Sequence, residues 1–225
     1  MDEETTAMLD HVRTALHESG AHGFDHTERV VRLCEEIGAR EGADMAVLIP
    51  AALFHDIARP LEEETGVPHE EEGARIAESY LRSIRYPKDR IAAVVHAIRA
   101  HRYSSGIAPE TLEARVLSDA DNLDAMGAVG IARTFMQAAT GRRAGAREDR
   151  RSSSATVCKT GDQEDRRSSS GIADATSHFH EKLLNLKDLM HTESARNIAE
   201  KRHAFLVAFI ETLDDEMGAR IPPDS

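Results

Sequence analysis

The sequence predicts an all-α fold, and three observations support this prediction. Aromatic residues make up only 4% of the 225 residues, Trp is absent, and Ala, Glu, Arg and Leu are abundant. Apolar residues recur every three or four positions along most of the chain, which is the spacing of one helix face. No segment shows the strict alternation of apolar and polar residues that is typical of a half-buried strand. The length suits one domain, residues 1–225, with enough chain to bury a sizeable core.

Three helices are expected in the first quarter of the chain, over residues 3–19, 26–41 and 44–58. Each carries an apolar stripe at helical spacing, such as Val30, Leu33, Cys34 and Ile37 in the second. Pro50 lies inside the third helix and can kink it. The segment from Pro60 to Pro68 is expected to form a loop.

Further helices are expected over 69–84, 88–102, 109–124, 126–139, 176–190 and 192–217. Residues 141–175 differ, because they are rich in Gly, Arg and Ser and repeat the segment 148–154 as 164–170. The short period excludes a solenoid repeat and favours a tandem duplication in a surface loop. We expect this insertion to be disordered, with a flexible lid or an anion-binding segment as the alternatives.

The net charge and the apolar content argue against several classes of protein, among them membrane proteins and proteins that bind nucleic acids. The net charge of −12 argues against broad binding to nucleic acids or anionic membranes. The longest apolar run, residues 46–54, is too short for a bilayer, which needs about 20 residues. The acidic N-terminus lacks signal-peptide features, and Cys34 and Cys158 are interpreted as free thiols. We therefore expect a cytoplasmic protein without a membrane or nucleic-acid polymer as partner.

The adjacent His55 and Asp56 are the most informative residues of the chain. They close the apolar run 46–54, and Asp56 lies on the same helix face as Ile49 and Ala52. Burying a carboxylate costs several kcal/mol unless a cation or hydrogen-bond donors compensate it. A divalent metal with His55 as a nitrogen ligand is one solution. A pair that faces solvent at the helix end is the other.

Two further features favour a metal. Asp25, followed three residues later by Glu28, predicts a helix that starts with Asp25 as its N-cap. His26 would then lie in the first turn, where its imidazole can point into a site. The acidic cluster from Ser118 to Asp124 follows an apolar stripe, which indicates a core helix that carries carboxylates. Spacing alone does not select one Asp of this cluster, and a solvated acidic face is the alternative.

The order of His26, then His55-Asp56, then an Asp of the 119–124 cluster resembles that of the HD-domain superfamily of metal-dependent phosphohydrolases. Flanking stretches resemble one branch, the small bacterial HD-domain nucleotide pyrophosphohydrolases: residues 25–30, 51–59, 97–101, 119–133 and 178–184. The resemblance covers nearly all of the chain except 141–175 and implies an HD-domain helical bundle. It also implies four metal ligands, namely His26, His55, Asp56 and Asp121. Asp121 matches the family's Ala-Asp-x-Leu step, whereas Asn122 stands where the family often has Arg.

The resemblance implies cleavage of (deoxy)nucleoside triphosphates to monophosphate and pyrophosphate. One divalent ion is expected, Mn²⁺ first, with Fe²⁺, Ni²⁺, Zn²⁺ and Mg²⁺ as other options. Such an ion activates water near neutral pH and polarises a phosphoryl oxygen. Asp56, His69 and His101 are expected to be catalytic, or the two histidines to bind a second ion. His96 lies five residues before His101, so we expect only one of these two to face the site.

Substrate phosphates need cationic partners, and the candidates are Lys182, Arg29, Arg59 and Lys187. The expected partner is a small phosphorylated molecule, a nucleotide by preference, and both a monomer and a homodimer remain open. One alternative is a phosphomonoesterase or phosphodiesterase that acts on another small nucleotide. Another is a sensor that binds a nucleotide through the metal site without turnover. A purely structural helical scaffold would leave the His55-Asp56 pair unexplained.

Overall fold

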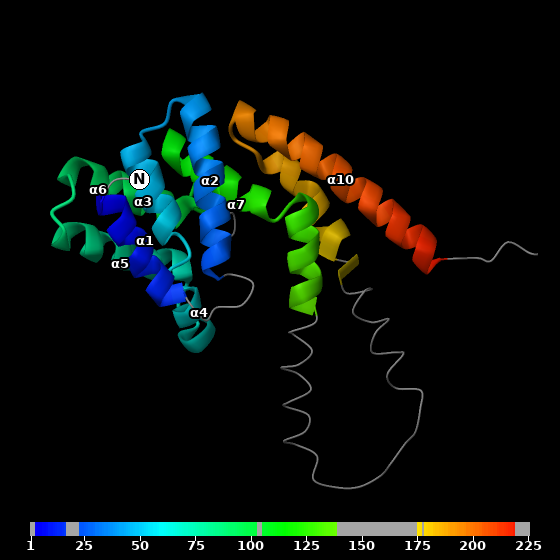
Figure 1. The fold of residues 1–225 in the computed structure, drawn as a ribbon, viewed down its shortest axis with the longest axis horizontal. Coiled ribbons are helices and arrows are strands. Elements are labelled where there is room, and N and C mark those ends of the chain that lie inside the picture. The colour runs from blue at the N-terminus through cyan, green and yellow to red at the C-terminus, as the bar shows by residue number, and fades with distance from the viewer. Residues whose placement is uncertain (1–2, 17–22, 103–104, 139–174, 177, 219–225) are drawn as a thin grey trace, which may run out of the picture. The chain divides into compact units, whose positions relative to one another are not determined.

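The computed structural model describes residues 3–16, 23–102, 105–138, 175–176 and 178–218 (Figure 1). Within these ranges the chain forms helices and no strand, which confirms the predicted all-α class. The helices are α1 (Glu3–Leu16), α2 (Phe24–Glu41), α3 (Met45–Phe54), α4 (Arg59–Thr65), α5 (His69–Ser83), α6 (Lys88–Ala100), α7 (Leu112–Asp124) and α10 (Glu193–Met217). Residues 127–138 are also helical, and Leu183–Leu189 form a 3₁₀ helix. Among the described residues, no helix combines the length and the apolar character that crossing a membrane requires.

Contacts within the chain define two compact units. The first contains residues 1–124 and 189–199, and the second contains residues 125–188 and 200–225. Eight of the residues that the sequence selected for the site belong to the first unit, whereas Lys182 and Lys187 belong to the second. The organisation as one domain remains a prediction. The predicted insertion with its repeat falls almost entirely on residues 139–174, which lie outside the described part of the chain.

Helix α3 occupies the centre of the first unit, where it contacts α1, α2, α5, α6 and α7. Its sequence is apolar on every side, and seven of its ten residues are buried. A helix without a polar face can satisfy its side chains only in the interior. The chain that leaves α3 therefore begins in the core, which carries His55 and Asp56 into buried positions. Pro50 is accommodated inside this helix.

The start of α2 differs from the prediction. The helix begins at Phe24 with Gly23 as its N-cap, and no side chain caps it. Asp25 lies in the first turn and accepts a hydrogen bond from Arg29 Nη1 at 3.0 Å, so its assignment as the N-cap is wrong. His26 is nevertheless in the first turn, as expected.

The segment from Pro60 to Pro68 is not a loop, because its first part forms α4. Pro60 lies in the first turn of this helix, where a residue without an N–H costs no intrahelical hydrogen bond. The helix ends at Gly66, whose φ of 74° is in the left-handed region. The predicted helix over 44–58 correspondingly ends at Phe54. Helix α4 then places Glu62 beside His69.

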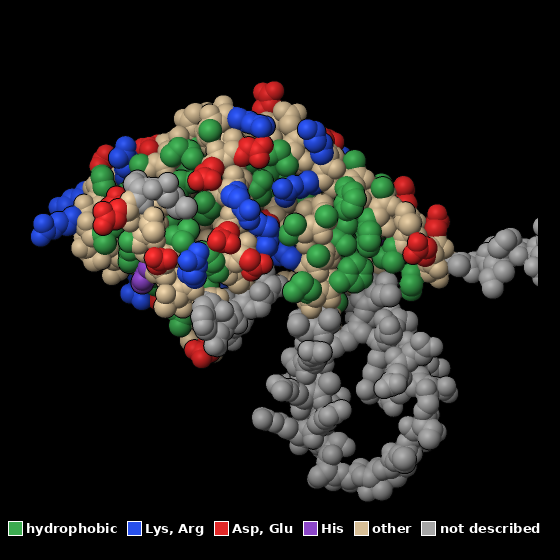
Figure 2. Space-filling view, in the orientation of Figure 1, with side chains coloured by type: hydrophobic (Ala, Val, Ile, Leu, Met, Phe, Trp, Pro, Cys, Tyr) green, Lys and Arg blue, Asp and Glu red, His purple; other side chains and the backbone are tan. Residues whose placement is uncertain are grey.

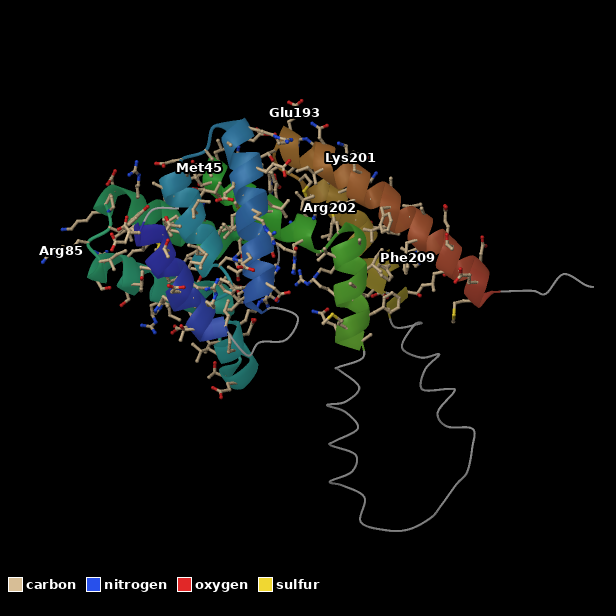
Figure 3. The ribbon with its side chains drawn as sticks, viewed as in Figure 1. Met45, Arg85, Glu193, Lys201, Arg202 and Phe209 are labelled. Carbon is tan, nitrogen blue, oxygen red and sulfur yellow. The ribbon has the colours of Figure 1, made fainter. Side chains whose placement is uncertain are left out.

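The second unit packs around three aromatic rings. The ring centroids of Phe135 and Phe179 are 5.9 Å apart, and each lies 6.1 Å from that of Phe209 on α10 (Figure 3). Gly127, with φ of 68°, would place a Cβ atom 3.2 Å from Arg202 Cγ. The predicted helix over 176–190 is replaced in its second half by the 3₁₀ helix. Apolar side chains also gather on the outer surface of this unit (Figure 2): Val129, Met136, Phe205 and Met217.

Asp119 on α7 holds the start of α10. Its carboxylate accepts hydrogen bonds from the backbone N–H of His191 and of Thr192, both at 2.8 Å, and from the Thr192 hydroxyl at 2.7 Å. The Asp119→Ala substitution leaves these donors unpaired, and we expect it to lower the free energy of unfolding by about 2–3 kcal/mol. Urea denaturation of the metal-free protein measures this loss. Metal binding by the folded variant should be unchanged, and a lost metal would place Asp119 among the ligands instead.

Candidate metal centre

Four imidazoles and two carboxylates converge inside the first unit. His26 comes from α2, His69 from α5 and Asp121 from α7, while His55, Asp56 and His101 directly follow the ends of α3 and α6. The four imidazoles and Asp56 are at most 1% exposed. The Asp121 side chain is 26% exposed, so the site approaches solvent on the side of α7.

The converging atoms form two clusters that share Asp56. The first cluster is His26, His55, Asp56 and Asp121. Its His26 Nε2 lies 3.3 Å from Asp121 Oδ1, 3.3 Å from His55 Nε2 and 3.5 Å from Asp56 Oδ2. The structure thus brings together the four ligands that the family resemblance implied.

The second cluster is Asp56, His69 and His101, whose ligand atoms lie within 4.8 Å of one another. Asp56 Oδ1 is 3.2 Å from His69 Nε2 and 3.8 Å from His101 Nε2. One oxygen of Asp56 therefore faces each cluster. His96 lies elsewhere, since its Nε2 accepts the backbone N–H of Glu110 at 3.1 Å.

Each of the four imidazoles in the two clusters is oriented by a hydrogen bond from its Nδ1 atom. His26 donates to Asp124 Oδ2 at 2.7 Å and His69 to Glu62 Oε2 at 2.8 Å. His55 and His101 donate to the carbonyl oxygens of the residues three positions earlier, at 2.8 and 2.6 Å. Because all four Nδ1 atoms are occupied in this way, all four Nε2 atoms point to the interior. Histidines that bind metals show the same arrangement.

The protonation states also fit a cation. Burial lowers the pKa of His26, but hydrogen bonds to Asp121 and Asp124 and the charges of Asp121 and Asp56 outweigh burial and raise this pKa to about 9. Burial lowers the pKa of His55 to about 4 and also lowers that of His101. Burial opposes ionisation of Asp121, but the His26 hydrogen bond and charge hold the pKa of this carboxyl below its usual range. Neutral His55 and His101 thus offer lone pairs beside carboxylate oxygens, and this donor set suits a divalent ion once His26 has lost its proton.

Metal binding should release a proton. In the metal-free protein His26 is protonated up to about pH 9, and a metal must displace this proton from Nε2. We expect affinity for Mn²⁺ to rise with pH by on the order of tenfold per unit between pH 6 and 8. Isothermal titration calorimetry at pH 7, in buffers of different ionisation enthalpy, should count one released proton. Binding without proton release would contradict a role of His26 as ligand.

The same pKa shift makes the opposite contribution to folding of the metal-free protein. The pKa of His26 in the folded state, about 9, exceeds its ordinary value of 6.5. The stability from this shift is fully present below pH 6.5 and is lost as pH rises toward 9. In the metal-free protein, His26 should therefore contribute more to the free energy of unfolding at pH 6 than at pH 9.

Arg29 is bound to a carboxylate beside the first cluster. Its Nε donates to Asp124 Oδ1 at 2.7 Å, and its Nη2 donates to Asp124 Oδ2 at 3.1 Å. Asp124 is 1% exposed and was not selected from the sequence. The three Asp residues of the acidic segment therefore have three separate contacts: Asp119 with the start of α10, Asp121 with the first cluster, and Asp124 with His26 and Arg29. The family's Ala-Asp-x-Leu step had selected Asp121, but no sequence signal predicted the contacts of Asp119 and Asp124.

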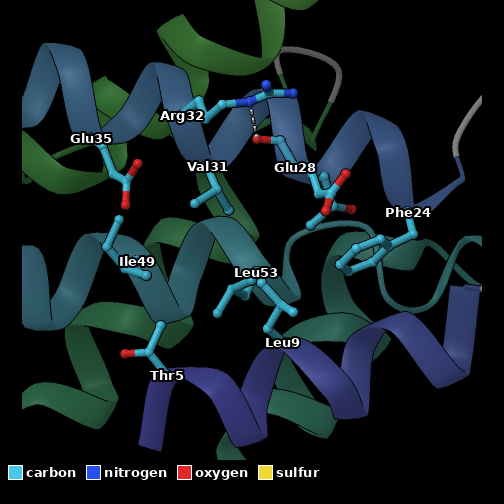
Figure 4. A pocket seen from close by; sticks show the side chains of 10 residues that line it. Thr5, Leu9, Phe24, Glu28, Val31, Arg32, Glu35, Ile49 and Leu53 are labelled. Carbon is cyan, nitrogen blue, oxygen red and sulfur yellow. Dashed lines mark hydrogen bonds between the residues drawn. The ribbon is translucent and has the colours of Figure 1, made fainter. Parts of the chain in front are cut away.

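An apolar pocket beside these helices is separate from both clusters. A pocket of about 260 Å³ lies between α1, α2 and α3, where Leu9, Phe24, Val31, Ile49 and Leu53 line it (Figure 4). None of the converging imidazoles or carboxylates lines this pocket. The chemistry of the two clusters is therefore argued from their own geometry.

Comparison with known proteins connects this geometry to a family. The HD domain model matches residues 23–126, the segment that contains both clusters. The protein YpgQ of Bacillus subtilis (strain 168) is 33% identical over 206 residues, which are 89% of this chain and 86% of YpgQ. Ribonuclease Y of Chloroflexus aurantiacus is 35% identical over 102 residues, which are 45% of this chain but 18% of that enzyme.

Solved structures give the same relationship over nearly the full chain. The crystal structure of Bacillus subtilis YpgQ in complex with ADP has a TM-score of 0.67 and 30% identity, and covers 95% of each chain. A predicted HD superfamily hydrolase from an uncultured Thermotogales bacterium has a TM-score of 0.65 and 32% identity, and covers 95% of this chain and 92% of its own. The chain therefore belongs to the HD superfamily of metal-dependent phosphohydrolases.

Proposed function

We propose that this protein hydrolyses small nucleotides and converts (deoxy)nucleoside triphosphates to monophosphate and pyrophosphate. The observation that supports this proposal is the first cluster. Two imidazoles and two carboxylates converge there, and the Asp121 side chain is partly exposed to solvent. A divalent ion in this cluster, Mn²⁺ by preference, would polarise a phosphoryl oxygen and lower the pKa of water. The structure of YpgQ with ADP supports a nucleotide as the ligand.

The surrounding residues supply orientation and proton handling. Asp124 and Glu62 fix the rings of His26 and His69 through their Nδ1 atoms. His101 Nε2 lies 3.8 Å from Asp56 Oδ1, beside His69. We propose that His69 and His101 position the attacking water, accept its proton at Nε2 and pass this proton to the leaving phosphate oxygen.

Lys182 and Lys187, which the sequence predicts as partners of substrate phosphates, belong to the second unit, and their role stays a prediction. Their ammonium groups would pair with phosphate oxygens through charge-assisted hydrogen bonds. Arg29 and Arg59 were predicted for the same task, but each donates to buried or half-buried carboxylates of the first unit. These two guanidinium groups therefore fit a positioning role better than direct contact with substrate.

Product analysis tests this proposal. Protein loaded with Mn²⁺ is incubated with ribo- and deoxyribonucleoside triphosphates, and phosphorus NMR separates the products. We expect monophosphate and pyrophosphate from the wild type and from Asp89→Ala, an exposed acidic control on α6, and neither product from Asp121→Ala. Orthophosphate alone would favour the phosphomonoesterase. Cleavage of a single-stranded RNA oligomer, included because of the Ribonuclease Y match, would favour a phosphodiesterase. Binding without turnover would favour a sensor.

A further inference from the structure

A side-chain cation already contacts the second cluster. Arg59 Nε donates to Asp56 Oδ1 at 3.0 Å. The same oxygen lies 3.2 Å from His69 Nε2, and it is the oxygen that a metal ion in the second cluster would need. The Arg59 side chain is 19% exposed, so its guanidinium is largely shielded from water. A positive charge from the protein thus lies where the ligands alone suggest a second metal.

Local structure holds this guanidinium in place. Arg59 is the first residue of α4, and its backbone N–H donates to Asp56 O at 3.0 Å. Pro60 follows in the first turn, where its fixed φ favours the helix start. One turn later, Glu62 Oε2 accepts a hydrogen bond from Arg59 Nη1 at 3.2 Å. Arg59 is therefore clamped between two carboxylates and not merely directed toward one.

The formal charges of the side chains around the two clusters sum to zero when one divalent ion is added and the imidazoles are counted as neutral. In the first cluster, Asp56 and Asp121 match the two positive charges of one ion, and Asp124 is matched by Arg29. Around the second cluster, Arg59 and Arg102 match Glu62 and Glu70, with Arg102 Nη1 at 3.2 and 3.6 Å from the two carboxylates. A second divalent ion would add two positive charges without partners. Uncompensated buried charge is strongly unfavourable.

We infer that Arg59, through its contact with Asp56 Oδ1, supplies the positive charge of the second cluster and limits this protein to one divalent ion, although His69 and His101 could ligate another. This inference rests on the proposed metal centre. It makes Arg59 a positioning residue: the guanidinium occupies Oδ1 and holds Asp56 so that Oδ2 serves the first cluster. Loss of this positive charge would leave Oδ1 and the two imidazoles available to a second ion.

Metal stoichiometry tests the inference independently of activity. Protein is equilibrated with excess Mn²⁺, freed of unbound ion by gel filtration and measured by elemental analysis. We expect one ion per chain in the wild type and in Arg59→Lys, and two ions in Arg59→Ala and Arg59→Gln. Arg102→Ala is the matched control, because it removes a guanidinium that contacts Glu62 and Glu70, and it should keep one ion. Electron paramagnetic resonance should show coupling between two Mn²⁺ ions in Arg59→Ala and its loss in Arg59→Ala/His101→Ala.

The outcomes separate this inference from the proposed function. A wild type that binds no ion overturns the proposed metal centre itself. A wild type with two ions, or Arg59→Ala and Arg59→Gln variants that both keep one, overturns the role of Arg59 and leaves the metal centre standing. A second ion in Arg102→Ala also overturns it, because the total charge would then decide and not the contact with Asp56. Circular dichroism shows whether each variant folds. If Arg59→Ala does not fold, the metal content of Arg59→Gln decides the test.

Discussion

Asp56→Ala should bind no metal and should lose activity by on the order of a thousandfold or more. Asp56 is the one residue that belongs to both clusters, with Oδ2 facing His26 and Oδ1 facing His69. A metal contributes several kcal/mol of transition-state stabilisation in hydrolysis of phosphate bonds, and this contribution disappears with the ion. Elemental analysis of metal content and kcat/KM for the best triphosphate measure the two losses.

Two controls make this result interpretable. Asp89→Ala removes an exposed carboxylate from α6 and should leave both quantities unchanged. Asp56→Asn keeps the side-chain shape and guards against a variant that fails to fold, which circular dichroism would reveal. A folded Asp56→Ala protein with full activity would refute the metal centre as the active site.

Asp124→Ala should weaken binding of Mn²⁺ by about 10- to 100-fold, as expected for a residue that orients a metal ligand. The carboxylate accepts the His26 Nδ1 proton at 2.7 Å, which aligns Nε2 with the first cluster. Without Asp124 the ring can rotate, and the Arg29 guanidinium loses its bidentate partner. Saturating Mn²⁺ should restore most of kcat, because the ligands themselves remain. Calorimetric titration gives the affinity, and activity as a function of Mn²⁺ concentration gives the rescue.

Asp119→Ala is the matched control, since it removes a buried carboxylate from the same helix. It should destabilise the protein but leave the affinity for Mn²⁺ as in the wild type. Equal losses of affinity in the two variants would show a general disturbance of α7 and contradict a specific orienting role. A loss of kcat that no Mn²⁺ concentration restores would instead place Asp124 in direct contact with the reacting groups.

The sequence predicted those features of the structure that depend on a single physical cause. The run from Ala46 to Phe54 has no polar face, so it predicted a buried helix. Whether His55 and Asp56 at its end are buried or face solvent was left open, and the structure buries both. The ordered set of His and Asp residues identified the superfamily, and the match of the HD domain model to residues 23–126 confirms it. These signals are local or ordered along the chain, and neither depends on which surfaces meet in the folded protein.

The sequence did not predict those features that depend on competing local preferences or on tertiary contacts. Pro60 and Pro68 indicated a loop, yet proline is also compatible with the first turn of a helix, and α4 uses Pro60 there. Asp25 fits the pattern of an N-cap but pairs with Arg29 after Gly23 has started the helix. The contact of Arg29 with Asp124 joins residues that only the packed helices bring together. Arg59 instead contacts Asp56 and Glu62, which lie three residues before and after it. A cationic side chain in a sequence does not reveal its partner.

The wide separation of the first-cluster ligands along the chain links metal binding to folding. His26 and Asp121 are brought together by the packing of α2 against α7, so an unfolded chain offers no preformed site. An ion that binds only the folded state adds to its stability through mass action, by about 2.7 kcal/mol at a hundredfold excess over Kd. Metal supply would thus govern not only turnover but also the lifetime of the folded protein. Chelation would expose the chain to unfolding and proteolysis.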